Sequence, residues 1–232
     1  MDFPGLHERV AEVRERISGA VRRGGHGQSV RLIAVTKTHG PEAVEAAWAE
    51  GITDVGENKV QEAAGKMDAL AGAPCTTGGI RWHLIGHLQT NKAKALPRFA
   101  LFHALDRDGL VDAVRAVAEK AGTALDVLVQ VNVSGEASKG GYAPSEVPAL
   151  AARLAAMPAL RVRGVMTMAP FDAEERVLRA VFAGARDCAA ALRAAGLPAT
   201  ELSMGMSGDY EVAVEEGATL VRLGTVLFGA RS

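Results

Sequence analysis

The stretch RLIAVTK, residues 31–37, is a short β-branched and apolar run that ends in a lysine. Seven further runs of the same kind follow, and stretches with helical periodicity separate them. Short strands that are apolar on both faces and alternate with helices are typical of a parallel sheet covered by helices. The seven further runs are TDVGEN from 53, RWHLIG from 81, LFHALD from 101, DVLVQVNV from 126, RVRGVMTM from 161, TELSMGM from 200 and TLVRLGT from 219.

Eight such runs predict an α/β fold with a single (β/α)8 barrel of the TIM type. The alternative is an open doubly wound sheet, but that fold favours a G-x-G-x-x-G turn after its first strand, and here AVTK is followed by THGPE. Leu6, Val10, Val13 and Ile17 recur at helical spacing, so residues from about 5 to 23 form an extra N-terminal helix. We expect this helix to pack near the seam where the barrel closes.

The composition fits one domain that spans residues 1–232. Hydrophobic residues make up 48% and the net charge is −1, which argues against disorder and against a basic surface for nucleic acid. No uncharged apolar run approaches the roughly 18 residues of a membrane span, and the N-terminus lacks the features of a signal peptide. Cys75 and Cys188 are far apart and lack metal-binding spacing, so we expect no metal, no disulfide framework and a cytoplasmic location.

Polar residues gather at the ends of the predicted strands, where TIM barrels assemble their active sites. Lys37 ends the first run, Glu57 and Asn58 end the second, and Asp106 follows the fourth. The position of Lys37 is compatible with an exposed loop lysine. It is equally compatible with a partly buried amine whose lowered pKa makes it a nucleophile toward an aldehyde.

Two loops near the C-terminus have the composition of a phosphate site. SMGMSGD (203–209) precedes a helical stretch, and RLGT (222–225) adds a glycine and a hydroxyl at the end of the eighth run. Ordinary helix capping by Ser207 or Asp209 explains either loop alone. Barrels that bind phosphate commonly use the loops after strands seven and eight, so the pair favours a phosphate site. A phosphate site opposite Lys37 fits a phosphorylated aldehyde cofactor such as pyridoxal 5′-phosphate (PLP).

The chain resembles the pyridoxal-phosphate homeostasis protein family, which is related to the N-terminal barrel of alanine racemase (PLP fold type III). The sequence departs from the commoner family pattern after Lys37, where His39-Gly40 replaces Lys-Pro. The matching segments occur in family order between residues 34 and 231: AVTKTHG, VGENKVQE, WHLIGHLQTNKAK, HALDR, VLVQVNVSGEASKGG, RGVMTMAP and LSMGMSGDYEVAVEEGATLVRLGTVLFGAR.

The resemblance also implies which residues hold the cofactor. Asn91, Asn132 and Lys139 would line the same rim without an assigned contact, and the role of His39 stays open. His83 has a second interpretation, as an inward barrel side chain satisfied by its neighbours. The residues assigned to PLP are Lys37 as the Schiff-base lysine, Ser207, Gly224 and Thr225 at the phosphate, Arg222 beside the pyridine nitrogen, and Asn58 and His83 near the ring.

The same residues favour binding over catalysis. Arg222 can only donate hydrogen bonds, so it would leave the pyridine nitrogen unprotonated and the ring a weak electron sink. Alanine racemase, as the family is known, takes its second base from a tyrosine of a C-terminal β-domain, and this chain ends at Ser232. Tyr142 and Tyr210 are the only tyrosines, and no motif places either of them opposite Lys37.

We therefore expect a non-catalytic PLP-binding protein of intracellular PLP homeostasis, which buffers the cofactor and supports amino-acid and vitamin B6 balance. Its expected partners are PLP and, transiently, apo forms of PLP-dependent enzymes, and we expect a monomer. One alternative is a PLP-dependent amino-acid racemase or a related fold type III enzyme. Another is a TIM barrel that binds some other phosphate compound.

Overall fold

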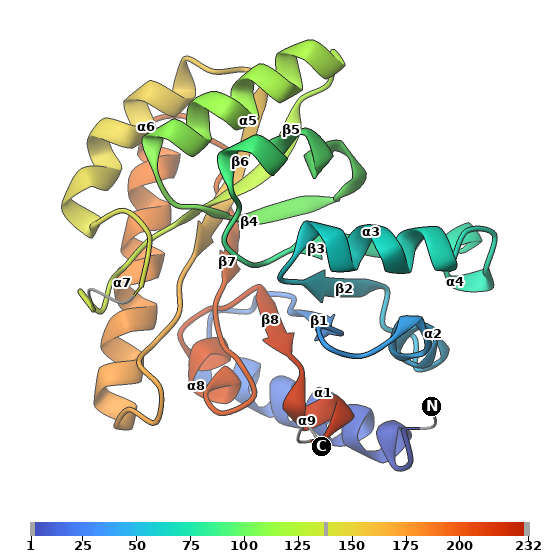
Figure 1. Ribbon diagram of the computed structural model, residues 1–232. Helices are drawn as coiled ribbons and strands as arrows, with labels where there is room; N and C mark the ends of the chain where they lie inside the picture. The colour runs from blue at the N-terminus through green and yellow to red at the C-terminus, as the bar shows by residue number, and fades with distance from the viewer. Residues whose placement is uncertain (1–2, 137–138, 230–232) are drawn as a thin grey trace.

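The computed structural model describes residues 3–136 and 139–229, and these residues form a closed barrel of eight parallel strands (Figure 1). The strands occur around the barrel in sequence order, and β1 pairs with β8 to close it. All eight predicted strands are therefore confirmed. Their bounds are β1 Arg31–Val35, β2 Asp54–Glu57, β3 Arg81–Leu84, β4 Leu101–Leu105, β5 Leu125–Gln130, β6 Leu160–Met166, β7 Glu201–Ser203 and β8 Leu220–Leu223.

Helices surround the barrel and bury their apolar faces against it. The connection from β3 to β4 differs from the others, because it is a 3₁₀ helix that contains Pro97 and buries Ala93 and Leu96. The helices are α1 Leu6–Gly24, α2 Pro41–Ala49, α3 Val60–Ala69, α4 Pro74–Thr77, η1 Thr90–Arg98, α5 Asp108–Ala121, η2 Pro144–Glu146, α6 Val147–Ala155, α7 Glu175–Ala194, α8 Tyr210–Glu215 and α9 Thr225–Phe228.

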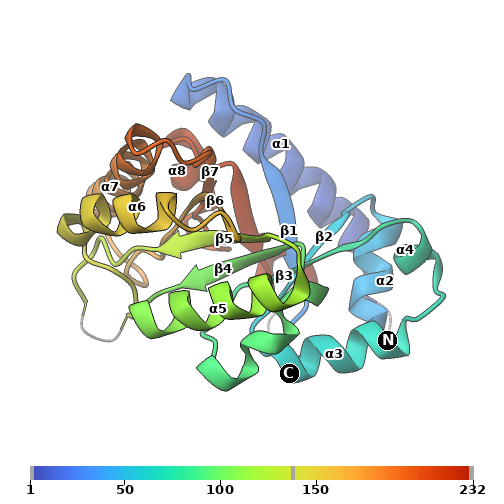
Figure 2. The same ribbon diagram turned by 90° about the horizontal axis from the view of Figure 1, so that it is seen from above.

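The N-terminal helix α1 covers the closing seam, as predicted. Its buried residues Val10, Val13 and Ile17 lie on one face, and the helix packs against α8 and α9, which flank β8. Figure 2 shows α1 along the outside of the barrel beside β1. The helix ends where Gly25 adopts φ 69°, a left-handed conformation that glycine reaches without strain.

The described residues contain neither a membrane-spanning helix nor a cluster of metal-binding side chains. Within residues 3–136 and 139–229, no helix is both long enough and apolar enough to cross a membrane. The same residues contain no group of three or more His, Cys, Asp and Glu side chains that could hold a metal ion. Cys75 and Cys188 are both buried free thiols.

Candidate functional site

A cavity of about 950 Å³ opens at the carboxyl ends of the strands, the end at which TIM barrels place their active sites. The cavity is lined by six of the seven residues that the sequence assigned to a cofactor. The seventh, His83, is 1% exposed and lies inside the barrel. The six lining residues are Lys37, Asn58, Ser207, Arg222, Gly224 and Thr225.

Lys37 lies on a tight turn directly after β1. The amide of His39 donates to the carbonyl of Thr36 over 3.1 Å, which closes the turn around Lys37 and Thr38. Thr38 has φ 71°, a left-handed conformation that is strongly disfavoured for a β-branched residue. Such strain persists only where surrounding contacts over-determine the backbone, and it is common at functional sites.

A buried ionic cluster supplies those contacts. The Nζ of Lys66 lies 2.6 Å from the Glu57 carboxylate and donates to the Thr36 carbonyl over 2.8 Å. Lys66 also pairs with Glu62, whose carboxylate accepts a 2.5 Å hydrogen bond from the amide of Thr38. The cluster therefore holds the backbone on both sides of Lys37.

Burial strongly affects the acid at the centre of this cluster. Glu57 is 0% exposed, and its Oε2 has no hydrogen-bond partner among the described residues. Burial raises the pKa of Glu57, although hydrogen bonds from Lys66 and Thr36 oppose the shift. Glu57, which the sequence placed at a strand end, therefore contacts the helix layer and does not line the cavity.

The two loops predicted to bind phosphate do meet in the structure. The hydroxyl of Ser207 accepts a 3.3 Å hydrogen bond from the amide of Val226 in α9, which ties the loop after β7 to the loop after β8. Asp209 accepts from the amide of Met206 over 2.6 Å and so shapes the first loop. Gly224 lies close to the first strand, because a Cβ there would be 3.3 Å from the carbonyl of Val35.

Arg222 reaches the cavity from β8 although it is 5% exposed. Its guanidinium donates to the Ser203 hydroxyl over 2.6 Å and to the Thr167 carbonyl over 3.0 Å. Burial lowers the pKa of Arg222 to about 10, so the group remains charged at neutral pH. The site therefore presents a fixed cation on its inner wall.

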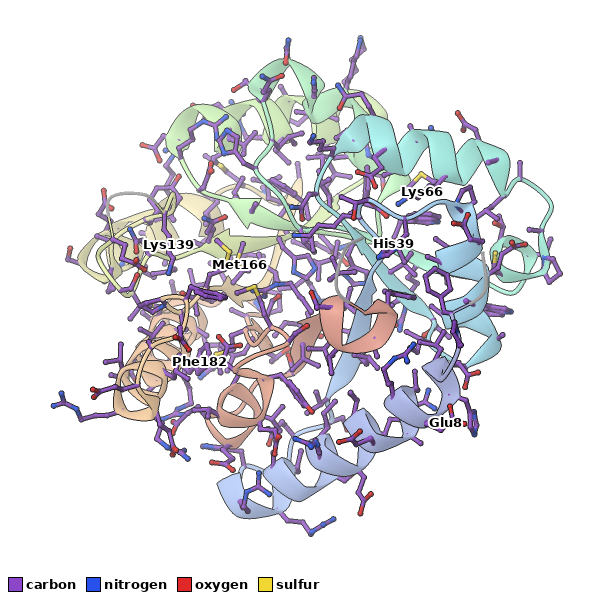
Figure 3. The ribbon with its side chains drawn as sticks, turned by 60° about the horizontal axis from the view of Figure 1, so that its bottom comes forward. Glu8, His39, Lys66, Lys139, Met166 and Phe182 are labelled. Carbon is purple, nitrogen blue, oxygen red and sulfur yellow. The ribbon has the colours of Figure 1, made fainter. Side chains whose placement is uncertain are left out.

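The cavity contains polar residues that the sequence did not assign to a role. His87 and Asp106 both line it, and the imidazole Nδ1 lies 2.8 Å from the carboxylate. Lys139 also lines the cavity and forms an ion pair with Glu136. In Figure 3, Lys139 lies on the side of the barrel opposite Lys66. The position of His87 after β3 and of Asp106 after β4 is the signal that could have predicted this pair.

Other residues of interest lie away from the cavity lining. The Asn132 amide donates to the carbonyls of Glu136 and Lys139, so it shapes its own loop. His39 packs against the rings of Phe3 and Phe228. Asn91 is exposed and does not line the cavity.

Neither tyrosine lines the large cavity either. The hydroxyl of Tyr142 donates to Asp108 over 2.9 Å, at the start of α5. Burial raises the pKa of Tyr142, and the hydrogen bond to Asp108 adds to the shift. Tyr210 is buried where α8 begins, next to Arg16 of α1.

The mouth of the cavity is apolar on one side. Phe171 is 97% exposed at the rim, and Met168, Pro170 and Leu178 line the wall beside it. Phe171 therefore adds exposed apolar surface beside the polar cavity. The loop that bears it follows β6, another carboxyl strand end.

Comparison with known proteins identifies relatives over nearly the whole chain. The family profile "Alanine racemase, N-terminal domain" matches residues 10–232. The pyridoxal phosphate homeostasis protein of Pseudomonas aeruginosa is 42% identical, with 97% of this chain and 96% of that protein covered. The protein of the same name from Aquifex aeolicus is 40% identical, with 97% of each covered.

Solved structures also resemble this chain over nearly its whole length. The structure of PipY from Synechococcus elongatus PCC7942 with PLP bound has a TM-score of 0.84 and 37% identity, with 97% of this chain and 100% of that chain covered. Alanine racemase from Streptomyces coelicolor A3(2) has a TM-score of 0.80 at 20% identity, and the alignment covers 100% of this chain and 59% of that chain. This similarity shows a shared fold. The chain belongs to the pyridoxal phosphate homeostasis protein family, as the resemblance predicted.

Proposed function

We propose that this protein binds PLP in the cavity at the carboxyl end of the barrel and serves intracellular PLP homeostasis. The observation that carries the proposal is that one cavity brings together Lys37, Arg222 and the two loops after β7 and β8. Relatives named pyridoxal phosphate homeostasis protein and a PLP-bound PipY structure support the same assignment.

The side chains of the cavity fit the chemistry of PLP. Lys37 offers a primary amine that can form a Schiff base with an aldehyde. Ser207 and Thr225 offer hydroxyl donors to a phosphate, and Gly224 lets the backbone approach closely. Arg222 offers a permanent donor to a ring nitrogen. PLP, when bound, would supply an electrophilic aldehyde and an electron-withdrawing ring.

The roles of this chain's residues follow from the same geometry. The strained turn and the buried Lys66 hold the Lys37 backbone, so that the amine projects from a fixed position. Arg222 does not protonate a ring nitrogen, because its pKa stays far above neutral. The cavity therefore favours retention of the cofactor over stabilisation of a carbanion, and we propose buffering and delivery as the role.

Two further assignments belong to the proposal. His83 acts on the ring indirectly, because it lies inside the barrel and not at the cavity wall. Asn58, which lines the cavity after β2, lies near the ring. We assign the protein to a reducing cytoplasm because Cys75 and Cys188 are both free and buried.

A transfer experiment tests the proposal. The PLP-loaded protein is freed of unbound cofactor and mixed with an apo form of a PLP-dependent enzyme, whose activity is followed with time. We expect activation by the native protein and little from a Lys37→Ala protein treated identically. Sustained racemisation or transamination of an amino acid at about 1 per second or faster by the native protein would contradict a binding role.

One observation keeps an amino-acid racemase as a second candidate. The His87–Asp106 pair lines the same cavity as Lys37 and has the composition of an acid–base dyad. Exchange of the α-hydrogen of amino acids in D₂O distinguishes the two functions. A racemase would catalyse exchange that a His87→Gln substitution abolishes, whereas a carrier would catalyse none above the rate of free PLP.

A further inference from the structure

Five polar side chains occupy the interior of the barrel, where apolar branched residues are usual. Each is at most 5% exposed, and together they span five strands. Only the last of them reaches the cavity. The five residues are Asp54 of β2, His83 of β3, His103 of β4, Ser203 of β7 and Arg222 of β8.

Hydrogen bonds join these side chains into one continuous chain. The Nε2 of His83 lies 2.8 Å from the Asp54 carboxylate, and its Nδ1 lies 2.9 Å from the Nε2 of His103. The Nδ1 of His103 lies 2.8 Å from the Ser203 hydroxyl, which accepts from Arg222 over 2.6 Å. Since β4 and β7 are not neighbours, the bond between His103 and Ser203 crosses the barrel interior.

When both imidazoles are neutral, the chemistry of the two ends fixes the direction of every bond. An ionised Asp54 can only accept, and Arg222 can only donate. His83 must therefore donate through Nε2 and accept at Nδ1, and His103 must do the same. Ser203 donates its proton to His103, which leaves its oxygen lone pairs for Arg222. All donors then point from Arg222 toward Asp54.

The charged groups around the chain agree with this assignment. Burial lowers the pKa of His83, although the hydrogen bond that His83 donates to Asp54 opposes this shift, and burial lowers the pKa of His103 well below its usual value. Asp54 accepts a further 2.6 Å hydrogen bond from Arg81, and Arg31 lies 3.9 Å away. Burial would raise the pKa of Asp54, but the hydrogen bonds from His83 and Arg81 lower it overall.

We propose that Asp54, His83 and His103 are positioning residues that aim the Arg222 guanidinium at the ligand in the cavity. They orient the Ser203 hydroxyl so that its oxygen faces Arg222, which fixes one edge of the guanidinium. The Thr167 carbonyl fixes a second donor. The remaining N–H groups then face the cavity, where an aromatic ring nitrogen accepts from them. This role rests on the proposed function, because it needs a ligand with such a nitrogen.

Substitution at His103 tests the proposal, since His103 lies outside the cavity lining. Asparagine keeps an acceptor near the position of Nδ1 for the Ser203 hydroxyl, whereas leucine removes this acceptor. A matched control is Met166→Leu, a buried residue of β6 that is not part of the chain and is labelled in Figure 3. Circular dichroism verifies that each variant is folded.

The first readout uses the ligand-free protein. ¹⁵N NMR of the imidazoles of His83 and His103 should show the Nε2–H tautomer of both at pH 7. A protonated ring, or an Nδ1–H tautomer of either residue, overturns the chain whether or not the protein binds PLP.

The second readout uses PLP labelled with ¹⁵N in its ring. We expect His103→Leu to shift the ring-nitrogen resonance and to weaken PLP binding about fivefold to tenfold, which corresponds to about one hydrogen bond. His103→Asn and Met166→Leu should both retain the native resonance. An unchanged resonance in His103→Leu overturns the positioning role. Failure of the native protein to bind PLP would instead contradict the proposed function.

Discussion

Replacement of Lys66 by methionine tests the buried cluster behind the Lys37 turn. Lys66 is 5% exposed and serves three acceptors, at 2.6, 2.8 and 3.0 Å. Methionine preserves much of the side-chain volume but removes the charge and all three hydrogen bonds. The Glu57 carboxylate, 0% exposed, would then keep only the Thr36 hydroxyl as a donor among the described residues.

The cost follows from leaving a buried charge unpaired. Removal of one partner of a buried ion pair typically destabilises a protein by about 3–5 kcal/mol. We therefore expect the Lys66→Met protein to lose about 3–5 kcal/mol of its free energy of unfolding at pH 7. The double variant Glu57→Gln/Lys66→Met should lose less, because no unpaired charge stays buried.

The pH dependence gives a second check. Without Lys66, the folded-state pKa of Glu57 rises further above its unfolded value, so the folded protein binds an extra proton as the pH falls toward 5. Proton uptake by the folded state stabilises it. The loss caused by Lys66→Met should therefore be smaller at pH 5 than at pH 7.

Urea denaturation followed by circular dichroism measures these changes. The matched control is Lys120→Met, because Lys120 is exposed near the end of α5, and such a surface change should stay within about 0.5 kcal/mol. A loss below about 1 kcal/mol for Lys66→Met at pH 7 would refute the reasoning. So would a loss for the double variant that equals or exceeds the loss for Lys66→Met.

Local geometry sets the expected outcome at Thr38, at Gly86 and at the two buried histidines. Thr38→Gly should raise the free energy of unfolding by about 0.5–1 kcal/mol, because the left-handed conformation costs a β-branched residue more than the added chain entropy of glycine. Gly86→Ala should weaken PLP binding about tenfold, because its Cβ would lie 2.4 Å from the carbonyl of Asn58 and would displace this residue of the cavity lining, at a cost of about 1–3 kcal/mol if the strain is relieved only without the ligand. Because burial lowers the pKa of His83 and His103, the unfolded state binds more protons below about pH 6.5, and the free energy of unfolding should fall with the pH there.

Each of the three predictions has a result that would contradict it. A loss of stability of the Thr38→Gly protein in urea denaturation would contradict the first prediction. Gly65→Ala, a helical position with open space around it, should leave PLP binding unchanged, and equal effects of the two alanine substitutions would contradict the argument for Gly86. For the histidines, the double variant His83→Asn/His103→Asn should have a shallower decline in stability between pH 7 and pH 5.5, and an undiminished decline would contradict the assignment.

The grouping of the site residues could be predicted from the sequence because the barrel fold could be predicted. In a parallel barrel all carboxyl strand ends meet on one face, so the order of elements places Lys37, Ser207 and Thr225 together. The same order of elements places His87 after β3 beside Asp106 after β4, because consecutive strands are neighbours in such a barrel.

The interior of the barrel was not predictable in the same way. In RWHLIG, Trp82, His83 and Leu84 are all buried, so periodicity does not tell which side chain faces the axis. The partners of His83 come from other strands and depend on register. Lys66 was missed for a different reason. A lysine in an amphipathic helix usually indicates the solvated face of that helix. Lys66 is buried instead, because Glu57 lies at the adjacent strand end and pairs with it.

We expect Lys37 to carry the cofactor. The direct measurement is a visible absorption spectrum of the protein with PLP, followed by borohydride reduction and peptide mapping of the modified residue. Lys37→Ala and Lys139→Ala are treated identically, because both lysines line the cavity. We expect a Schiff-base band that reduction fixes on Lys37, absent from Lys37→Ala and retained in Lys139→Ala. No band after addition of PLP, or a modification confined to another lysine of the native protein, would contradict the claim.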